Sequence, residues 1–205
     1  MIEVSPTRME LLRLKKRTAV AKRGHKLLKD KQDELVRQLL ELIKRVKGLR
    51  ERVEQELIEA SRRFAFARAS MDPEAVEEAF LMPTMRVTVD VDVKRLMTVT
   101  IPQFRPKAEG EMIPYSFITT SPELDASLIA LRKAIESLLE LAAMEKSLQL
   151  LADEIERTRR RVNALEYVLI PELEAAVRYI SMKLSEMERG DLMRLMRIKE
   201  IVRAH

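Results

Sequence analysis

The sequence has no cysteine and no tryptophan, and only 4% of its 205 residues are aromatic. Without cysteine the chain can form neither a disulfide framework nor a thiolate metal site, which fits a reducing, cytosolic setting. Large aromatic side chains help to fill a rounded core. Their scarcity favours a long, narrow hydrophobic core instead.

Signals for membranes are also missing. The first residues lack the basic head and apolar stretch of a secretory signal. No charge-free apolar run reaches the ~18 residues that a membrane-spanning helix needs. We therefore expect a cytoplasmic protein that is peripheral to a membrane only through its partners.

Recognisable catalytic motifs are absent too. The sequence has no glycine-rich phosphate loop. Its two histidines, His25 and His205, lack further ligands at the spacing of a zinc site. Asp90 and Asp92 could form a metal pair, but a solvated strand face is the better interpretation. The sequence predicts no catalytic residue, no cofactor and no metal site, and a protein that is not itself an enzyme.

Charged residues, by contrast, are abundant and make up 35% of the chain, whereas glycine occurs only four times. This composition is typical of long helices and coiled coils. The net charge is +5, and the segment from Arg8 to Lys31 alone holds ten basic and two acidic residues. A basic end of this kind suits a nucleic acid, an anionic lipid or an acidic protein surface.

The pattern divides the chain into three regions: a long helix over 1–71, an insert over 72–121 and a second long helix over 122–205. In the first, Ser5 is a suitable cap and Pro6 suits the first helical position. Positions spaced alternately by four and three residues then form a heptad seam, and eleven of its sixteen residues are apolar. The seam consists of Thr7, Leu11, Leu14, Thr18, Ala21, His25, Leu28, Gln32, Leu35, Leu39, Leu42, Val46, Leu49, Val53, Glu56 and Ala60.

The insert contains two runs, 87–93 and 97–101, in which apolar and polar residues alternate with the period of a β-strand. They predict a hairpin that turns around Arg95 and ends at Pro102 and Pro106. An isolated hairpin is marginally stable, so this one should lean on the helices or on a partner.

The second long helix opens at Ser121 with the same Ser-Pro pair. Its predicted seam begins with Leu124, Leu128, Leu131, Ile135 and Leu138. The seam contains one short and one long step, which change the winding of a coiled coil locally. The long step brackets Pro171, which removes a helical hydrogen bond and predicts a bend. We expect Gly190 to break the helix.

Together these regions predict a mainly α fold, a long antiparallel two-helix coiled coil with a small insert that bears a β-hairpin. Two helices that share a seam resist twisting better than one. Gly24 costs ~1 kcal/mol relative to alanine inside a helix, which suggests close approach of the second helix. His25 is interpreted as a polar residue that sets the register. The predicted inter-helix packing residues are Gly24, His25, Leu28, Leu35, Leu39, Leu42, Val46, Leu49, Val53, Asn163, Ala164 and Leu165.

Two motifs carry a resemblance to a known family. The first consists of Pro6, Thr7, Arg8, Leu14, Lys15, Gly24, His25, Leu27, Leu28, Lys29 and Lys31. The second consists of Arg160 through Glu166, followed by Ile170 and Pro171. In this order, and flanking a β-bearing insert, they resemble the D subunit of rotary ATPases of the archaeal and vacuolar type.

The resemblance implies a central rotor shaft whose paired ends turn inside a ring of alternating A and B subunits, where ATP chemistry takes place. The insert would point toward the membrane and contact the small F subunit and the C subunit, which eukaryotes call d. Torque would then couple proton or sodium transport to ATP synthesis. The implied ring-side contacts are Pro6, Thr7, Arg8, Lys15, Lys22, Arg160, Arg161, Ile170 and Pro171.

Two alternatives remain open on the residues alone. A basic coiled coil could bind nucleic acid, with an affinity that falls steeply with salt, although aromatic platforms for bases are lacking. A generic scaffold rod would be a parallel homodimer with no need for the insert. One copy bound to a ring of three A and three B subunits would separate the rotor from both.

Overall fold

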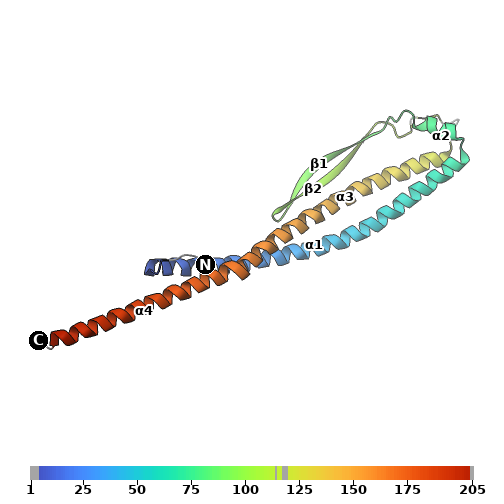
Figure 1. Ribbon diagram of the computed structural model, residues 1–205. Helices are drawn as coiled ribbons and strands as arrows, with labels where there is room; N and C mark the ends of the chain where they lie inside the picture. The colour runs from blue at the N-terminus through green and yellow to red at the C-terminus, as the bar shows by residue number, and fades with distance from the viewer. Residues whose placement is uncertain (1–4, 114, 117–119, 204–205) are drawn as a thin grey trace. The chain divides into compact units, whose positions relative to one another are not determined.

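The computed structural model describes residues 5–113, 115–116 and 120–203. Long helices and one two-stranded antiparallel sheet make up this part of the chain (Figure 1). The structure therefore confirms the predicted fold class. In chain order the elements are α1 (Arg8–Ser70), α2 (Pro73–Phe80), β1 (Arg86–Leu96), β2 (Val99–Glu109), α3 (Pro122–Asn163), the π-helix η1 (Ala164–Leu169) and α4 (Ile170–Arg203).

The structure forms two compact units, and both long helical stretches contribute to each of them. Unit 1 consists of residues 1–34 and 155–205, and unit 2 of residues 35–154. This division crosses α1 and α3, whereas the sequence pattern groups the residues by helix and insert.

In unit 1, the first part of α1 packs against α4. The core of the contact is a cluster of Leu14, Ala21, Leu173 and Ile180, all buried. Two ion pairs flank this cluster: Arg8 with Glu188 and Lys22 with Glu174, each at 2.7 Å. The residue number increases from the first pair to the second on α1 and decreases on α4. The two helices of unit 1 are therefore antiparallel, as predicted.

In unit 2, the second part of α1 packs against α3. Val46, Leu49 and Val53 bury their side chains against Leu141. Fifteen of the sixteen predicted seam positions of the first helix are buried or half-buried, and only Thr7 is exposed. The heptad pattern of α1 is thus confirmed along its length, because apolar side chains at this spacing all lie on one side of a helix.

The predicted seam of α3 is confirmed at Leu124, which is fully buried, and wrong at two later positions. Leu131 and Leu138 are 41% and 36% exposed, whereas Ser127 and Ala134 are buried. Small residues thus take the covered positions in this stretch. Leu131 instead lines an apolar pocket of about 200 Å³ between α2, the start of β1 and α3. The other residues of this pocket include Ala79, Phe80, Val87, Leu128 and Ile135.

Helix starts and ends differ from prediction in two places. Thr7, and not Ser5, caps α1, because its Oγ1 accepts a hydrogen bond of 3.2 Å from the Glu10 N–H. Ser121 does cap α3, where its Oγ accepts a bond of 3.3 Å from the Glu123 N–H. At the other end, α4 continues through Gly190 to Arg203. A single glycine costs helix stability but does not end a helix whose other residues favour it.

The hairpin is longer than predicted. β1 and β2 have 11 residues each and pair in register from Leu96 and Val99 outward, so the loop is Met97–Thr98. Met97 has a φ of 52°, the left-handed conformation that a two-residue hairpin loop requires. Pro102 and Pro106 lie inside β2 and do not end it. Proline is tolerated in an edge strand where its nitrogen points away from the neighbour.

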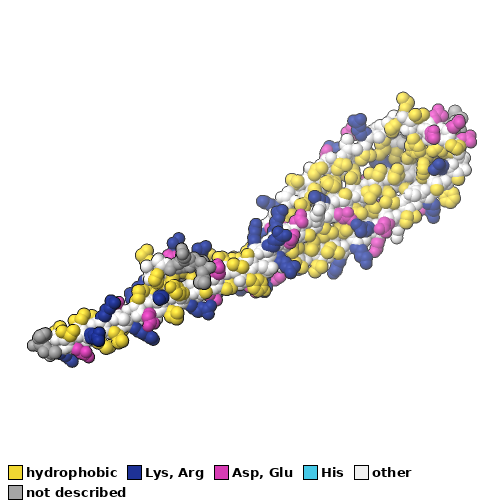
Figure 2. Space-filling view, viewed as in Figure 1, with side chains coloured by type: hydrophobic (Ala, Val, Ile, Leu, Met, Phe, Trp, Pro, Cys, Tyr) yellow, Lys and Arg dark blue, Asp and Glu magenta, His cyan; other side chains and the backbone are white. Residues whose placement is uncertain are grey.

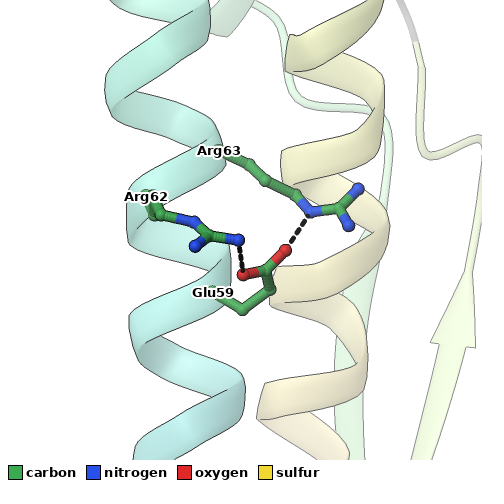
Figure 3. A network of polar contacts seen from close by, with 3 residues as sticks. All are labelled: Glu59, Arg62 and Arg63. Atoms are coloured by element: carbon green, nitrogen blue, oxygen red, sulfur yellow. Dashed lines mark hydrogen bonds and ion pairs between the residues drawn. The ribbon is translucent and has the colours of Figure 1, made fainter.

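Exposed charges of α1 pair along the helix as well as across it. Figure 3 shows Glu59, which accepts a hydrogen bond of 2.5 Å from Arg62 Nη2 and one of 2.7 Å from Arg63 Nε. The bond from Arg63, with the charges of both arginines, lowers the pKa of Glu59. Such exposed pairs add little stability, and they give the helix a charged, well-hydrated outer face.

Candidate partner interface

All nine residues that the sequence predicted on the ring side lie in unit 1. Eight of them are exposed: Pro6, Thr7, Arg8, Lys15, Lys22, Arg160, Arg161 and Pro171. Ile170 is half-buried and packs against the cluster around Leu14 and Leu173. Its side chain therefore supports the contact between α1 and α4.

A shallow groove runs across this surface between α1 and α4. It encloses about 420 Å³ and is lined by Lys15, Lys22 and Arg178, with Glu174 the only acid among its residues. Lys22 donates a hydrogen bond to Glu174, and together with its charge this lowers the pKa of that carboxyl. Lys15 forms no ion pair with any residue that the structure describes. The groove therefore keeps a net positive charge.

The arginines at the end of α3 are also on the surface. Arg160 forms an ion pair with Glu156 one turn earlier. Arg161 and Arg159 are exposed. The interpretation of this cluster as a solvated charged face is compatible with the structure, and so is its use as a contact for an acidic partner.

The residues predicted to pack between the helices have three different environments. Leu35, Val46, Leu49 and Val53 are buried. The half-buried group consists of Gly24, His25, Leu28, Leu39, Leu42 and Leu165. Asn163 and Ala164 are exposed, and this differs from the prediction. They lie at the junction of α3 and η1, and the covered side of the helix there is formed by Val162 and Leu165.

The expected close approach at Gly24 is wrong. A Cβ atom added there would meet no atom within 4 Å. The neighbouring His25 does contact the other helical stretch, since its Nε2 lies 3.3 Å from Oε2 of Glu166. This polar contact fixes one relative position of α1 and η1, which agrees with the interpretation of His25 as a residue that sets the register.

The irregularity predicted around Pro171 takes the form of a π-helix. The Ile170 N–H donates to the carbonyl of Leu165, five residues earlier, where an α-helix would use the residue four back. One extra residue is thereby accommodated before Leu173 returns to the core. Proline has no N–H to donate, so it fits directly after a segment whose hydrogen bonds have already shifted.

The last turns of α4 form a surface that the sequence analysis did not identify. Every described residue from Ser185 onward is exposed, and α4 runs on beyond the start of α1 (Figure 1). At about 100° per residue, the apolar side chains of this segment point in all directions around the helix axis. They are Leu192, Met193, Leu195, Met196, Ile198, Ile201 and Val202.

Figure 2 shows these apolar side chains as yellow patches between basic and acidic ones at the C-terminal end of α4. Apolar and charged side chains are interleaved around this segment, so no side of it is purely polar. The apolar spacing after Gly190 could have revealed this segment. Because the apolar residues of this segment do not form one stripe along the helix, a heptad pattern does not identify them.

Among the described residues, no group of three or more histidines, aspartates or glutamates could hold a metal ion. Nor is any described helix both long and apolar enough to cross a membrane. The candidate site is thus a contact surface with three parts in unit 1: the basic groove, the arginine cluster and the exposed end of α4.

Comparison with known proteins agrees with the motifs. Residues 10–200 match the family described as the ATP synthase D subunit. The D subunit of the V-type ATP synthase of Acetivibrio thermocellus is 51% identical over 205 residues, covering 98% of this chain and 92% of that protein. The proteins of the same name from Thermoanaerobacter sp. strain X514 and Fusobacterium nucleatum are 52% and 50% identical, each over 204 residues. These alignments cover 98% of this chain, and 98% and 97% of those proteins.

Proposed function

The chain belongs to the family of ATP synthase D subunits, and from this premise we propose how its surfaces serve a rotary motor. It is a non-catalytic central-stalk subunit of a V-type ATP synthase, a complex associated with a membrane. Its task is to carry torque between the ion-driven part of the complex and the part that makes ATP. The nucleic-acid and scaffold alternatives are not favoured.

The antiparallel packing in each unit supports a torque-bearing role. Core clusters tie α1 to α4 in unit 1 and to α3 in unit 2. Ion pairs cross between the helices beside both cores: Lys22 with Glu174, and Arg50 with Glu145 at 2.6 Å. To twist one helix about the other, these buried side chains would have to leave their positions in a close-packed core. The packing therefore resists torsion.

The exposed end of α4 is the observation that carries the proposed placement. Its apolar side chains, among them Leu195, Ile198 and Val202, surround a single helix and have no cover among the described residues. Water is a poor environment for such a surface. We infer that a ring of A and B subunits encloses it, while the catalytic sites belong to the ring.

The basic groove supplies the second proposed contact with the ring. Lys15, Lys22 and Arg178 present positive charge beside the α4 extension. Acidic loops on the inner wall of the ring would be attracted to them, and exposed ion pairs are weak and screened by salt. Weak contacts can be exchanged as the shaft turns. This suits a bearing better than tight binding would.

The insert is proposed to serve the other end of the machine. The hairpin and α2 lie in unit 2, away from the residues of the basic groove in sequence. We assign to this part the contacts with a small F subunit and with the C subunit that joins the membrane ring. The protein would then be cytoplasmic and peripheral to the membrane through these partners.

Reconstitution tests the proposal. Purified A and B subunits are assembled with and without this chain, and ATP turnover is followed over many cycles together with the subunit stoichiometry. Sustained turnover should require one copy of the chain for each ring of three A and three B subunits. Equal sustained turnover without the chain, or a self-dimer that ignores the ring, would contradict a role as the shaft.

Charge reversal separates ring contact from folding. Lys15 has no ion-pair partner among the described residues, so Lys15→Glu should leave the free energy of unfolding within ~0.5 kcal/mol of wild type and lower the ATP turnover of the reconstituted ring. Lys22→Glu combined with Glu174→Lys exchanges the two charges of the Lys22–Glu174 ion pair and so preserves the pair. This double variant is the matched control for folding. Losses of stability and turnover that always match would count against the contact.

A further inference from the structure

The last turns of α4 carry sulfur as well as hydrocarbon. The chain has twelve methionines and no cysteine, so thioethers are its only sulfur groups. Two of them, Met193 and Met196, lie in the exposed apolar segment after Gly190 and are 71% and 62% exposed. Residues three apart on a helix are neighbours on its surface. This segment therefore presents two accessible thioethers side by side.

No part of the chain that the structure describes covers these two side chains. Leu173 and Ile180, on the side of α4 that packs against α1, are fully buried in the core of unit 1. At about 100° per residue, Met193 and Met196 project from the opposite side of α4. Their sulfur atoms are therefore open to a small oxidant in the free chain.

Methionines elsewhere in the chain provide internal references. Met144 is half-buried and packs against the core of unit 2. The sulfur of Met71 accepts a hydrogen bond of 3.4 Å from the Ser121 N–H. Met82 and Met97 are exposed, but they belong to unit 2. The chain thus holds covered thioethers as well as exposed ones that lie outside α4.

Oxidation by a peroxide changes the character of a thioether reversibly. The sulfur takes one oxygen atom from hydrogen peroxide: an S=O bond forms, the O–O bond breaks, and the rest of the peroxide leaves as water. The sulfur loses two electrons and the peroxide gains them. The product, methionine sulfoxide, is polar where the thioether was apolar, and sulfoxide reductases, one for each epimer, restore methionine.

We propose that Met193 and Met196 are a peroxide-sensitive modification site, whose oxidation makes the end of α4 polar and prevents the unassembled chain from entering the ring. The oxygen of a sulfoxide accepts hydrogen bonds, and enclosing such a group without a donor is unfavourable. Once the ring surrounds the segment, the sulfur atoms are shielded, so the modification acts before assembly. The proposal rests on the proposed function for the identity of the enclosing partner.

Oxidation of the isolated full chain tests the site. The chain is treated with dilute hydrogen peroxide, the peroxide is removed, and peptide mass spectrometry measures each sulfoxide. Met193 and Met196 should be oxidised about tenfold faster than Met144. The urea midpoint of unfolding should not change, because both side chains are exposed. The oxidised chain should bind a ring of untreated A and B subunits about tenfold more weakly, and sulfoxide reductases should restore the binding.

Three paired variants make the test specific. Met193→Leu with Met196→Leu keeps the apolar surface and removes both sulfur atoms, so this chain should bind the ring equally well before and after peroxide treatment. Met82→Leu with Met97→Leu removes exposed sulfur atoms of unit 2 and should leave the sensitivity of wild type unchanged. Met193→Gln with Met196→Gln makes the site polar permanently and should weaken binding without any peroxide.

Equal oxidation rates at Met193, Met196 and Met144 would overturn the proposal, as would an equal loss of ring binding in the leucine variant or full binding by the glutamine variant. A measurement without the ring separates this inference from the proposed function. Peroxide should lower the retention of the free chain on a hydrophobic-interaction column more for wild type than for the leucine variant, and an equal fall in both would also contradict the site. If the untreated chain does not join the ring while this difference remains, the proposed function fails, and the oxidative loss of apolar surface at the end of α4 stands.

Discussion

Two polar side chains within the seam show how individual residues shape this protein. Thr158 is fully buried in unit 1, and its hydroxyl has no hydrogen-bond partner in the described part of the chain. Glu56 occupies a seam position in unit 2 and lies 3.3 Å from Lys133. Burying a polar group lowers stability unless it is hydrogen-bonded. Thr158 therefore lowers the stability of unit 1. Glu56 is compensated only in part, because Lys133 contacts its Oε1 while its buried Oε2 has no hydrogen-bond partner in the described part of the chain.

Thr158→Val should stabilise the protein. Valine keeps the shape of threonine and removes the unsatisfied hydroxyl, so the free energy of unfolding should rise by ~1 kcal/mol in urea titrations. Thr18→Val is the control. The Thr18 hydroxyl donates a hydrogen bond of 2.8 Å to the carbonyl of Leu14, so its removal should not stabilise the protein. A similar gain at both sites would show that the missing bond is not the cause.

Glu56 should make stability depend on acid pH. Its pKa is held below the ordinary value of 4.5, chiefly because Ser137 donates a hydrogen bond to it, with Lys133 and Arg52 adding to the effect. A carboxyl with a lowered folded-state pKa stabilises the fold fully above its unfolded pKa, and this contribution is lost as the pH falls through the folded value. The stability difference between wild type and Glu56→Gln should thus shrink from about pH 6 to pH 3.

Urea unfolding of both proteins at a series of pH values measures this. Glu51→Gln, at an exposed position of the same helix, is the matched substitution. If the difference in the free energy of unfolding between wild type and Glu56→Gln stays constant across the whole pH range, the charge of the Glu56 carboxylate does not contribute to stability.

At the scale of the elements, the glycines of α1 combine a helical conformation with open space. At Gly24 and Gly48 an added Cβ would meet nothing within 4 Å. Each substitution by alanine should therefore raise the free energy of unfolding by ~1 kcal/mol. Gly110→Ala should do the reverse, because its φ is +96° and a Cβ there would lie 2.2 Å from the Thr84 carbonyl oxygen. Thermal unfolding of the three variants decides whether open space predicts the sign.

The elements also show why part of the fold could be predicted from sequence and part could not. The seam of α1 follows from spacing alone, because each side chain has a fixed direction on a helix. In α3 the same reasoning selected Leu131 and missed Ala134, since a helix with a second neighbour has two covered sides and the larger side chains need not face the first. Pro102 was interpreted as a strand end, because the edge position that tolerates it depends on the pairing.

Part of the candidate site could likewise be predicted from the sequence, and part could not. Charge at Lys15 and Lys22 is visible in the sequence, and the structure adds the groove that joins them to Arg178. Ile170 belonged to the resemblance motif, but only packing shows that its side chain supports the core. The end of α4 escaped notice because its signal is the absence of a polar side, which a search for stripes does not detect.

At the scale of the whole molecule, removal of residues 191–205 should separate folding from function. The described residues of this segment are all exposed, so the free energy of unfolding should stay within ~0.5 kcal/mol of wild type. ATP turnover of the reconstituted ring should fall severalfold, because the apolar end no longer reaches its enclosing partner. Full turnover with the shortened α4 would contradict the proposed bearing.

The π-helix η1 has a consequence for insertions and deletions. Successive residues of an α-helix are rotated by about 100° about its axis. A one-residue deletion in a regular stretch therefore rotates every later side chain away from the residue that it contacts. Between Ala164 and Leu169 the chain already holds one residue too many for α geometry. A deletion of Tyr167 joined with Pro171→Ala should therefore leave Leu173 and Ile180 facing α1. A one-residue deletion between Leu151 and Thr158 should not. A one-residue deletion in η1 should therefore leave the side chains of α4 facing α1, so that the core of unit 1 is kept.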